Sequence, residues 1–329
     1  MKKILILTGI FALWLASCSR DHKKILPESS GKTHNILLIM DDQDWKESIG
    51  DSIRKYFAVE FNDLPQAEPI FNLQQAAPEL YNGIFKTVRD AIIVKKGDNP
   101  GIRFYKDKYA EPQLIAIIEG KDKQQIKELI HQHAKEIVQK FSDFEIANLQ
   151  RKHRNALRNS QDVEKELGIS IEIPDFFALV DHQKNFFWFR RDLKNGEQDI
   201  LLYSVPLKDS LDLSGDRVIY YRDSIGKKYI PGPVDSTYMK TETNISPSQI
   251  YTQINGNKAI ETRGLWNMKN DFMGGPYLNY TIADPKHKRM IVAEGFVYAP
   301  AINKRDYIVQ LEAILKTIKL KNEEKKEEN

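Results

Sequence analysis

Apolar residues recur at helical spacing in four parts of the chain. Trp45, Ile49, Ile53 and Phe57 fall on one face of residues 41–57, which predicts an amphipathic helix there. The clearest stripe follows residue 121 and comprises Ile126, Leu129, Ile130, His133, Ile137 and Phe141. A second helical segment carries Ile146, Leu149, His153 and Leu157, with Gly168 as its stop. The last stripe comprises Tyr307, Ile308, Leu311, Ile314, Leu315 and Ile318, with Asn303 and Asp306 as the expected capping pair.

Short apolar runs of strand length accompany these helices. They lie at 35–40, 90–95, 102–105 and 113–118, and β-rich runs dominate from residue 170 onward. The strands mostly follow one another without an intervening helix, which favours antiparallel pairing. We therefore predict an α+β fold, with mainly antiparallel sheets packed against amphipathic helices. Strand–helix pairs at 114–141 and 290–318 each contain Glu-Gly, so two similar subdomains from a duplication remain an alternative.

These patterns divide the chain into five parts. We predict a signal peptide at 1–17, a flexible tether at 18–33 and an N-terminal α/β subdomain at 34–168. A β-rich C-terminal subdomain ending in a helix follows at 169–320, and a charged, solvated tail at 321–329.

The first residues have the pattern of a secretory signal. Lys2 and Lys3 precede an uncharged run that ends at Ala16, which is too short to span about 30 Å of hydrocarbon as a helix. The run ends in Leu15-Ala16-Ser17-Cys18, which resembles a bacterial lipobox. We expect cleavage before Cys18 and lipid on its thiol, so that the chain contacts a membrane through this residue. An ordinary signal peptide that ends near a cysteine is the alternative.

Composition and charge narrow the classes of function. Cys18 is the only cysteine, so its lipidation would exclude disulfides and thiol catalysis. Of 49 Lys and Arg, removal of Lys2 and Lys3 leaves 47 against 46 Asp and Glu. A chain with this balance lacks the excess of basic residues that is typical of nucleic-acid-binding proteins. It also lacks an excess of positive charge that would strengthen binding to anionic lipid, so the lipid on Cys18 alone would attach it to the membrane.

No motif predicts a metal, a cofactor or a nucleophile. His131 and His133 are two residues apart, which does not suit a helical zinc site. Asp41, Asp42 and Asp44 open a predicted helix, where helix capping explains them better than a cation does. The chain has no G-x-S-x-G, Walker A or G-x-G-x-x-G pattern.

One segment has the composition of a ligand pocket. The block from Arg263 to Tyr277 combines a guanidinium, an indole, amides, a carboxylate and a Gly-Gly turn. The residues that we select from it as candidates for binding a ligand or partner are Arg263, Trp266, Asn270, Asp271, Gly274, Gly275 and Tyr277. The alternative is a loop between two strands, with Trp266 and Phe272 packed inward. A hydrolase that uses paired carboxylates from Glu261, Asp271 and Glu294 is the catalytic alternative, and the separation of those carboxyls would decide it.

Four features together resemble a family of Bacteroidetes lipoproteins known only as a domain of unknown function. They are the lipobox, Leu64-Pro65-Gln66-Ala67-Glu68-Pro69-Ile70-Phe71-Asn72, Tyr229-Ile230-Pro231-Gly232-Pro233-Val234-Asp235 and the Arg263–Tyr277 block. The resemblance implies an envelope lipoprotein and no known activity. In that phylum surface lipoproteins tend to carry acidic residues after the cysteine, whereas Ser19-Arg20-Asp21-His22-Lys23-Lys24 is mainly basic. We therefore expect an outer-membrane lipoprotein that faces the periplasm.

The leading hypothesis is a non-catalytic binding or assembly factor whose partner is an envelope protein or glycan. A hydrolase acting on cell-wall glycan or peptide is the second hypothesis. A structural spacer without a pocket is the third.

Overall fold

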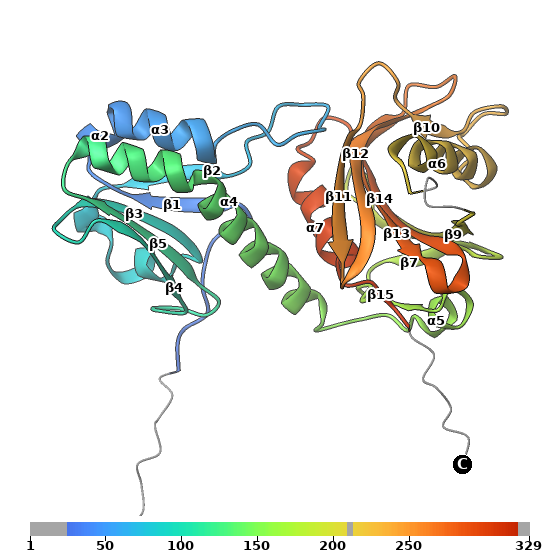
Figure 1. Cartoon of the computed structure of the whole chain (residues 1–329), viewed down its shortest axis with the longest axis horizontal. Helices are drawn as coiled ribbons and strands as arrows, with labels where there is room; N and C mark the ends of the chain where they lie inside the picture. Colours follow the sequence, from blue (N-terminus) through green and yellow to red (C-terminus); the bar gives the residue numbers. More distant parts are fainter. Residues whose placement is uncertain (1–24, 209–212, 322–329) are drawn as a thin grey trace, which may run out of the picture.

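The computed structural model describes residues 25–208 and 213–321, which form two domains joined by one long helix (Figure 1). Cys18, the predicted signal peptide, part of the tether and all but Lys321 of the predicted tail lie outside the described residues. No described helix is long and apolar enough to cross a membrane.

The N-terminal domain contains a five-stranded sheet. Its strands are β1 (Asn35–Ile39), β2 (Asn72–Ala76), β3 (Asp90–Lys96), β4 (Gly101–Lys106) and β5 (Leu114–Gly120), in the order β2-β1-β3-β5-β4. The pairs β1–β2, β1–β3 and β3–β5 are parallel, and only β4 runs antiparallel to its neighbour. This sheet departs from the predicted antiparallel pairing, because helical segments after β1 and β2 return the chain to the same edge.

Helices cover one face of this sheet and short 3₁₀ turns the other. The helices are α2 (Asp42–Lys46), α3 (Ser48–Phe57) and α4 (Lys123–His153), and the turns are η1 (Pro78–Leu80) and η2 (Gly83–Thr87). Ile49, Ile53 and Phe57 are buried, which confirms the predicted stripe. The amide of Gln43 donates to Oδ1 of Asp41 at 3.0 Å, so this aspartate caps a helix as expected.

The helix α4 belongs to both domains. It is one helix of 31 residues, where the sequence suggested two segments, and at 1.5 Å per residue it is about 46 Å long. Its first half packs on the N-terminal sheet. In its second half Leu149 packs against Val309 and Ala313 of the C-terminal domain, and Gln150 Nε2 donates to the Ala313 carbonyl at 3.0 Å.

The C-terminal domain contains an eight-stranded antiparallel sheet, as predicted. Its strands are β7 (Ala178–Gln183), β8 (Phe186–Leu193), β9 (Gly196–Pro206), β10 (Met239–Thr241), β11 (Ser248–Ile254), β12 (Asn257–Met268), β13 (Gly274–Asp284) and β14 (Arg289–Tyr298). The order is β10-β12-β13-β14-β9-β8-β7, with β11 also on β12. The helices α5 (Gln161–Leu167) and α7 (Arg305–Leu315) cover one face, and α6 (Gly215–Tyr229) covers the other. A short pair, β6 (Ile169–Ser170) with β15 (Lys319–Leu320), and the turn η4 (Pro285–His287) complete the domain. The α+β class is therefore confirmed.

The two domains do not share a topology, so the alternative of two similar subdomains fails. The two Glu-Gly pairs have a local explanation instead. A Cβ on Gly120 would lie 2.8 Å from Ile126 Cγ1, and one on Gly295 would lie 2.9 Å from Leu311 Cβ. Each glycine lets the following helix approach its strand closely.

The segment between α3 and β2 caps the last helix. The amides of Lys304 and Arg305 lie 2.6 Å and 3.2 Å from carboxylate oxygens of the buried Glu68. Arg305 Nη1 also donates to the Pro69 carbonyl at 2.6 Å. The predicted capping pair of Asn303 and Asp306 is wrong, because Lys304 is the N-cap residue and Glu68, remote in sequence, supplies the carboxylate.

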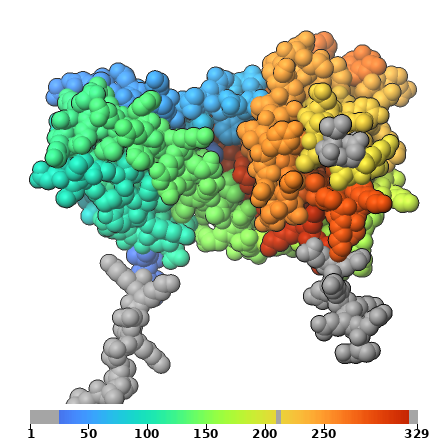
Figure 2. Space-filling model, viewed as in Figure 1, coloured from blue at the N-terminus to red at the C-terminus, as the bar shows by residue number. Residues whose placement is uncertain are grey.

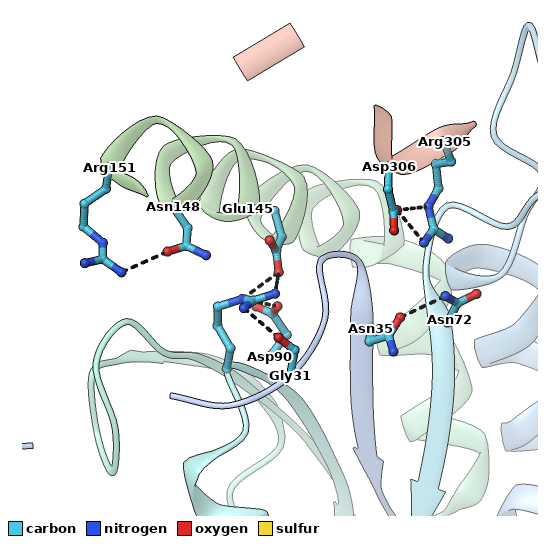
Figure 3. Close-up of polar contacts among 10 residues, drawn as sticks. Gly31, Asn35, Asn72, Asp90, Glu145, Asn148, Arg151, Arg305 and Asp306 are labelled. Carbon is cyan, nitrogen blue, oxygen red and sulfur yellow. Dashed lines mark hydrogen bonds and ion pairs between the residues drawn. The ribbon is translucent and has the colours of Figure 1, made fainter. Parts of the chain in front are cut away.

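A buried ionic cluster fixes α4 to the N-terminal sheet (Figure 3). Arg89 Nε donates to Glu145 Oε1 at 2.9 Å and lies 3.4 Å from Asp90 Oδ2. All three side chains are buried. Burial, and then the neighbouring Glu145, raise the pKa of Asp90 well above its ordinary value. Asp90 is therefore protonated more readily than an exposed aspartate.

Candidate binding cleft between the domains

A cavity lies where the two domains meet. Its volume is about 480 Å³, within the range of about 300–1,000 Å³ that is usual for ligand sites. The segment at 60–63 and α4 form one side, and β11, β12 and α7 form the other. Figure 2 shows this hollow between the green and the orange parts of the surface.

Arg263 is the central charge of the C-terminal wall. It lies two residues from Glu261 on β12, so both side chains are on the same face of the strand. Arg263 Nε donates to Glu261 Oε1 at 2.5 Å, and Arg263 Nη2 donates to Glu312 Oε2 at 2.8 Å. Lys316 Nζ contacts the other Glu312 oxygen at 2.5 Å. Burial by itself raises the pKa of Glu312, but Arg263 and Lys316 outweigh it and lower that pKa to about 2.

Two polar groups in the cleft wall have no hydrogen-bond partner. His34 is only 3% exposed, and neither of its ring nitrogens has a partner. Burial lowers the pKa of His34, so its imidazole is neutral near pH 7 and offers one donor and one acceptor. Arg263 Nη1 is also buried without a partner. Unsatisfied buried groups of this kind are uncommon and cost free energy unless a ligand or water meets them.

The remaining wall is acidic and apolar. Glu60, Asp63 and Asp143 add three carboxylates beyond the pairs around Arg263, although Asp63 Oδ2 accepts from Ser248 Oγ at 2.5 Å. The apolar side chains that line the cleft are Phe61, Ile70, Val138, Ile146, Ile250 and Val309. The cleft therefore suits a ligand that carries both positive charge and apolar groups.

The structure divides the predicted binding block among several places. Arg263 lines the cleft, while Trp266, Asp271, Gly274 and Gly275 line a second pocket of about 250 Å³. Asn270 is exposed in the turn between β12 and β13, at a φ of 60°. Tyr277 is buried in the core, with its ring centre 3.8 Å from the Arg222 guanidinium carbon. The seven candidates thus do not form one site.

The alternative, a loop between two strands with Trp266 and Phe272 packed inward, holds for Trp266 and fails for Phe272. Trp266 is buried and its Nε1 donates to the Val297 carbonyl at 3.3 Å. Phe272, which that alternative places inward, is fully exposed at the turn.

The three carboxylates of the catalytic alternative do not meet. Glu261 is opposite Tyr280 in the sheet and Glu294 is opposite Asn279, one position along, so the two side chains leave opposite faces. Glu294 is buried 2.9 Å from Arg222 Nη2, and burial raises its pKa. Asp271 lies in the exposed turn, where its Oδ1 accepts from the amide of Phe272 at 2.6 Å. No pair from this set faces one cleft. Residues 25–208 and 213–321 also contain no group of three or more His, Cys, Asp or Glu that could hold a metal ion.

Solved structures and curated proteins give little guidance. No curated protein matches the chain. The Ran-binding protein Mog1p of Saccharomyces cerevisiae matches at 11% identity with a TM-score of 0.33, over 46% of this chain and 90% of that one. A structure of a Mog1 mutant gives the same values. A likeness this weak says nothing about function.

The family comparisons divide the chain as the two domains do. Residues 29–154 match the model of a domain of unknown function (DUF8532), and residues 156–317 match the model of another (DUF4837). The sequence patterns place the division after residue 168, whereas the family models divide the chain at residue 155. Val163 and Leu167 of α5, which lie between these two positions, pack in the C-terminal core. From residue 29 to residue 317, apart from residue 155, the chain is therefore similar to two successive domains of unknown function.

Proposed function

We propose that this chain is a lipid-anchored protein of the cell envelope that binds a partner, without catalysis, in the cleft between its domains. The lipobox-like residues before Cys18 support the anchor. The basic residues that follow support an outer-membrane position facing the periplasm. Family models of unknown function are compatible with this role and assign no other.

The observation that carries the proposal is the unsatisfied polarity of the cleft wall. His34 and Arg263 line the cavity between the domains, and each has at least one buried side-chain nitrogen without a hydrogen-bond partner in the described chain. A peptide ligand whose backbone carbonyls reach these nitrogens would accept hydrogen bonds from them and would recover part of the free energy that their isolation costs. The site belongs to both domains, so a ligand would also hold them together.

The charges of the cleft indicate the class of ligand. Arg263 and Lys316 are already paired with Glu261 and Glu312, so the remaining carboxylates determine the field that a ligand meets. We propose a basic segment of an envelope protein, with lysine or arginine beside apolar side chains. A glycan partner is less suited, because Phe61, which is only half-exposed, is the one Phe, Tyr or Trp among the described residues that line the cleft.

The double variant Glu60→Gln/Asp143→Asn tests this proposal. Both carboxylates are exposed at the cleft, and neither forms an ion pair in the described structure. The probe is a fluorescent peptide of alternating lysine and leucine, with a glutamate–leucine peptide for comparison. We expect the lysine peptide to bind and its Kd to rise roughly tenfold in the variant, since each exposed ion pair contributes up to about 1 kcal/mol.

A variant on the same helix provides the control. Glu128 accepts from Gln124 Nε2 at 3.0 Å, as Asp143 accepts from Gln139 Nε2 at 2.8 Å, but it lies outside the cleft. Glu128→Gln should leave the Kd unchanged, and added salt should weaken binding to the wild-type chain. The proposal would be contradicted if the wild-type chain bound both peptides with equal affinity. It would also be contradicted if Glu128→Gln raised the Kd as much as the double variant does.

A further inference from the structure

An exposed apolar surface lies on the N-terminal domain, away from the cleft. It is formed by Leu80, Ile84 and Phe85 of the turns η1 and η2, whose exposed fractions are 51%, 74% and 38%. Three large apolar side chains within six residues, all exposed, are unusual on the surface of a soluble domain and mark interaction sites. We call this surface the η patch.

Tyrosine and lysine side chains surround the η patch. The rings of Tyr81 and Tyr109 meet edge to face at 6.3 Å. Lys86 Nζ lies 5.2 Å from the centre of the Tyr109 ring, and Lys108 Nζ lies 4.4 Å from that of Tyr105. The Tyr81 hydroxyl is buried, so this ring supports the patch from beneath. Lysine beside exposed Leu, Ile and Phe suits the interface of a bilayer, because its apolar stem enters the lipid while its ammonium group stays in water.

The described chain begins beside the η patch. The amide of Ser30 donates to the Thr87 carbonyl at 3.0 Å, at the end of η2, and the amide of Glu111 donates to the Pro27 carbonyl at 2.9 Å. Ile25 is 95% exposed at this edge, where the chain leaves the domain (Figure 1). Six residues lie between Cys18 and Ile25, so even a fully extended chain places these two residues at most about 25 Å apart.

We propose that the η patch inserts into the bilayer that holds the lipid on Cys18. This inference rests on the proposed lipid anchor, which brings the patch within reach of the membrane. Acidic residues close to the patch, Glu28, Glu79 and Glu111, offset its lysines, so contact depends on apolar insertion and not on anionic lipid. Insertion fixes the orientation of the N-terminal domain and leaves the cleft accessible from the periplasm.

Fluorescence quenching in vesicles tests the insertion. The acylated full chain, with Ile84→Trp, is reconstituted in phosphatidylethanolamine–phosphatidylglycerol vesicles whose acyl chains carry bromine. The signal of the wild-type chain is subtracted, because Trp45, Trp188 and Trp266 contribute to it. The matched control is Phe272→Trp, at an apolar residue in a turn of the other domain that is even more exposed than Ile84. We expect the indole at position 84 to be quenched roughly threefold more strongly, because bromine lies in the layer that the patch enters.

Two further measurements distinguish a failure of the proposed lipid anchor from a failure of the proposed insertion. Mass spectrometry establishes whether the mature chain carries acyl groups, and amide hydrogen exchange of the wild-type chain shows whether residues 80–86 gain protection on vesicles. A chain without acyl groups would overturn the anchor and this inference with it. An acylated chain with equal quenching at both positions and no added protection would overturn the η patch alone. Protection that appears only when envelope proteins are added would also overturn it, in favour of a protein partner.

Discussion

Replacing Arg263 by methionine tests the electrostatic arrangement of the cleft. Methionine keeps much of the side-chain volume but removes the charge that lies between Glu261 and Glu312. The pKa of Glu312 is about 2, against about 4.3 in an unfolded chain. This difference of about 2.3 pKa units corresponds to about 3 kcal/mol of stability at pH 7, at 1.36 kcal/mol per unit.

The direction of the pKa shift determines how the contribution of Glu312 to stability changes with pH. A carboxyl whose pKa is lowered by folding stabilises the protein above its unfolded pKa, and the contribution is lost as the pH falls through the folded value. For Glu312 the contribution is about 3 kcal/mol at pH 7 and about 2 kcal/mol at pH 3.5. We therefore expect Arg263→Met to lower the free energy of unfolding by about 3 kcal/mol at pH 7, and by about 1 kcal/mol less at pH 3.5.

Urea unfolding of the chain from Ser19 onward, followed by near-ultraviolet circular dichroism at both pH values, measures this effect. Arg154→Met is the control, because Arg154 pairs with Glu172 on the surface and its loss should cost less than about 1 kcal/mol. An equal loss of stability at pH 7 and pH 3.5 would show that Arg263 acts through packing alone. No loss at pH 7 would refute the role given to the ion pairs.

Two further predictions concern buried carboxyls outside the cleft. Burial raises the pKa of Asp199 to about 7, so its contribution to stability should fall by about 1.4 kcal/mol per pH unit as the pH rises from about 4 to about 7. Asp199→Asn should remove that slope in urea unfolding curves, whereas the exposed Asp192→Asn should keep it. Glu68→Ala should destabilise the first turn of α7 by about 2 kcal/mol, because it removes the carboxylate that accepts from the amides of Lys304 and Arg305. Hydrogen exchange should accelerate at these two amides, and unchanged exchange would mean that the cap is dispensable.

Periodicity predicted most of the elements of this fold. The spacing of Ile126, Ile130, Ile137 and Phe141 is sufficient to identify the first half of α4, because a helix that packs on a sheet must repeat its apolar residues every three or four positions. The parallel pairing in the N-terminal sheet was not predictable in the same way. The turns η1 and η2, which bring the chain back between β2 and β3, have no apolar stripe from which a helical connection could be recognised.

The cleft was only partly visible in the sequence. Glu261 and Arg263 alternate on one strand, and Arg263 was among the predicted candidates. His34, the segment at 60–63 and Glu312 are far apart in sequence and meet only through the folding of both domains. The sequence does contain one signal of a buried polar cluster. Glu145 and Asn148 occupy positions of α4 that continue its buried stripe, and charged or amide groups at such positions indicate a cluster of this kind.

The continuity of α4 has a consequence for how such proteins can diverge. A residue inserted into an α-helix advances it by 1.5 Å and rotates everything beyond it by about 100°. An insertion of one residue near Asp143 would therefore turn the C-terminal domain away from the other wall of the cleft, whereas the same insertion in a loop would be absorbed. Homologues that retain the cleft should accordingly preserve the length of α4 between its two packed halves, and should vary in length at the surface turns.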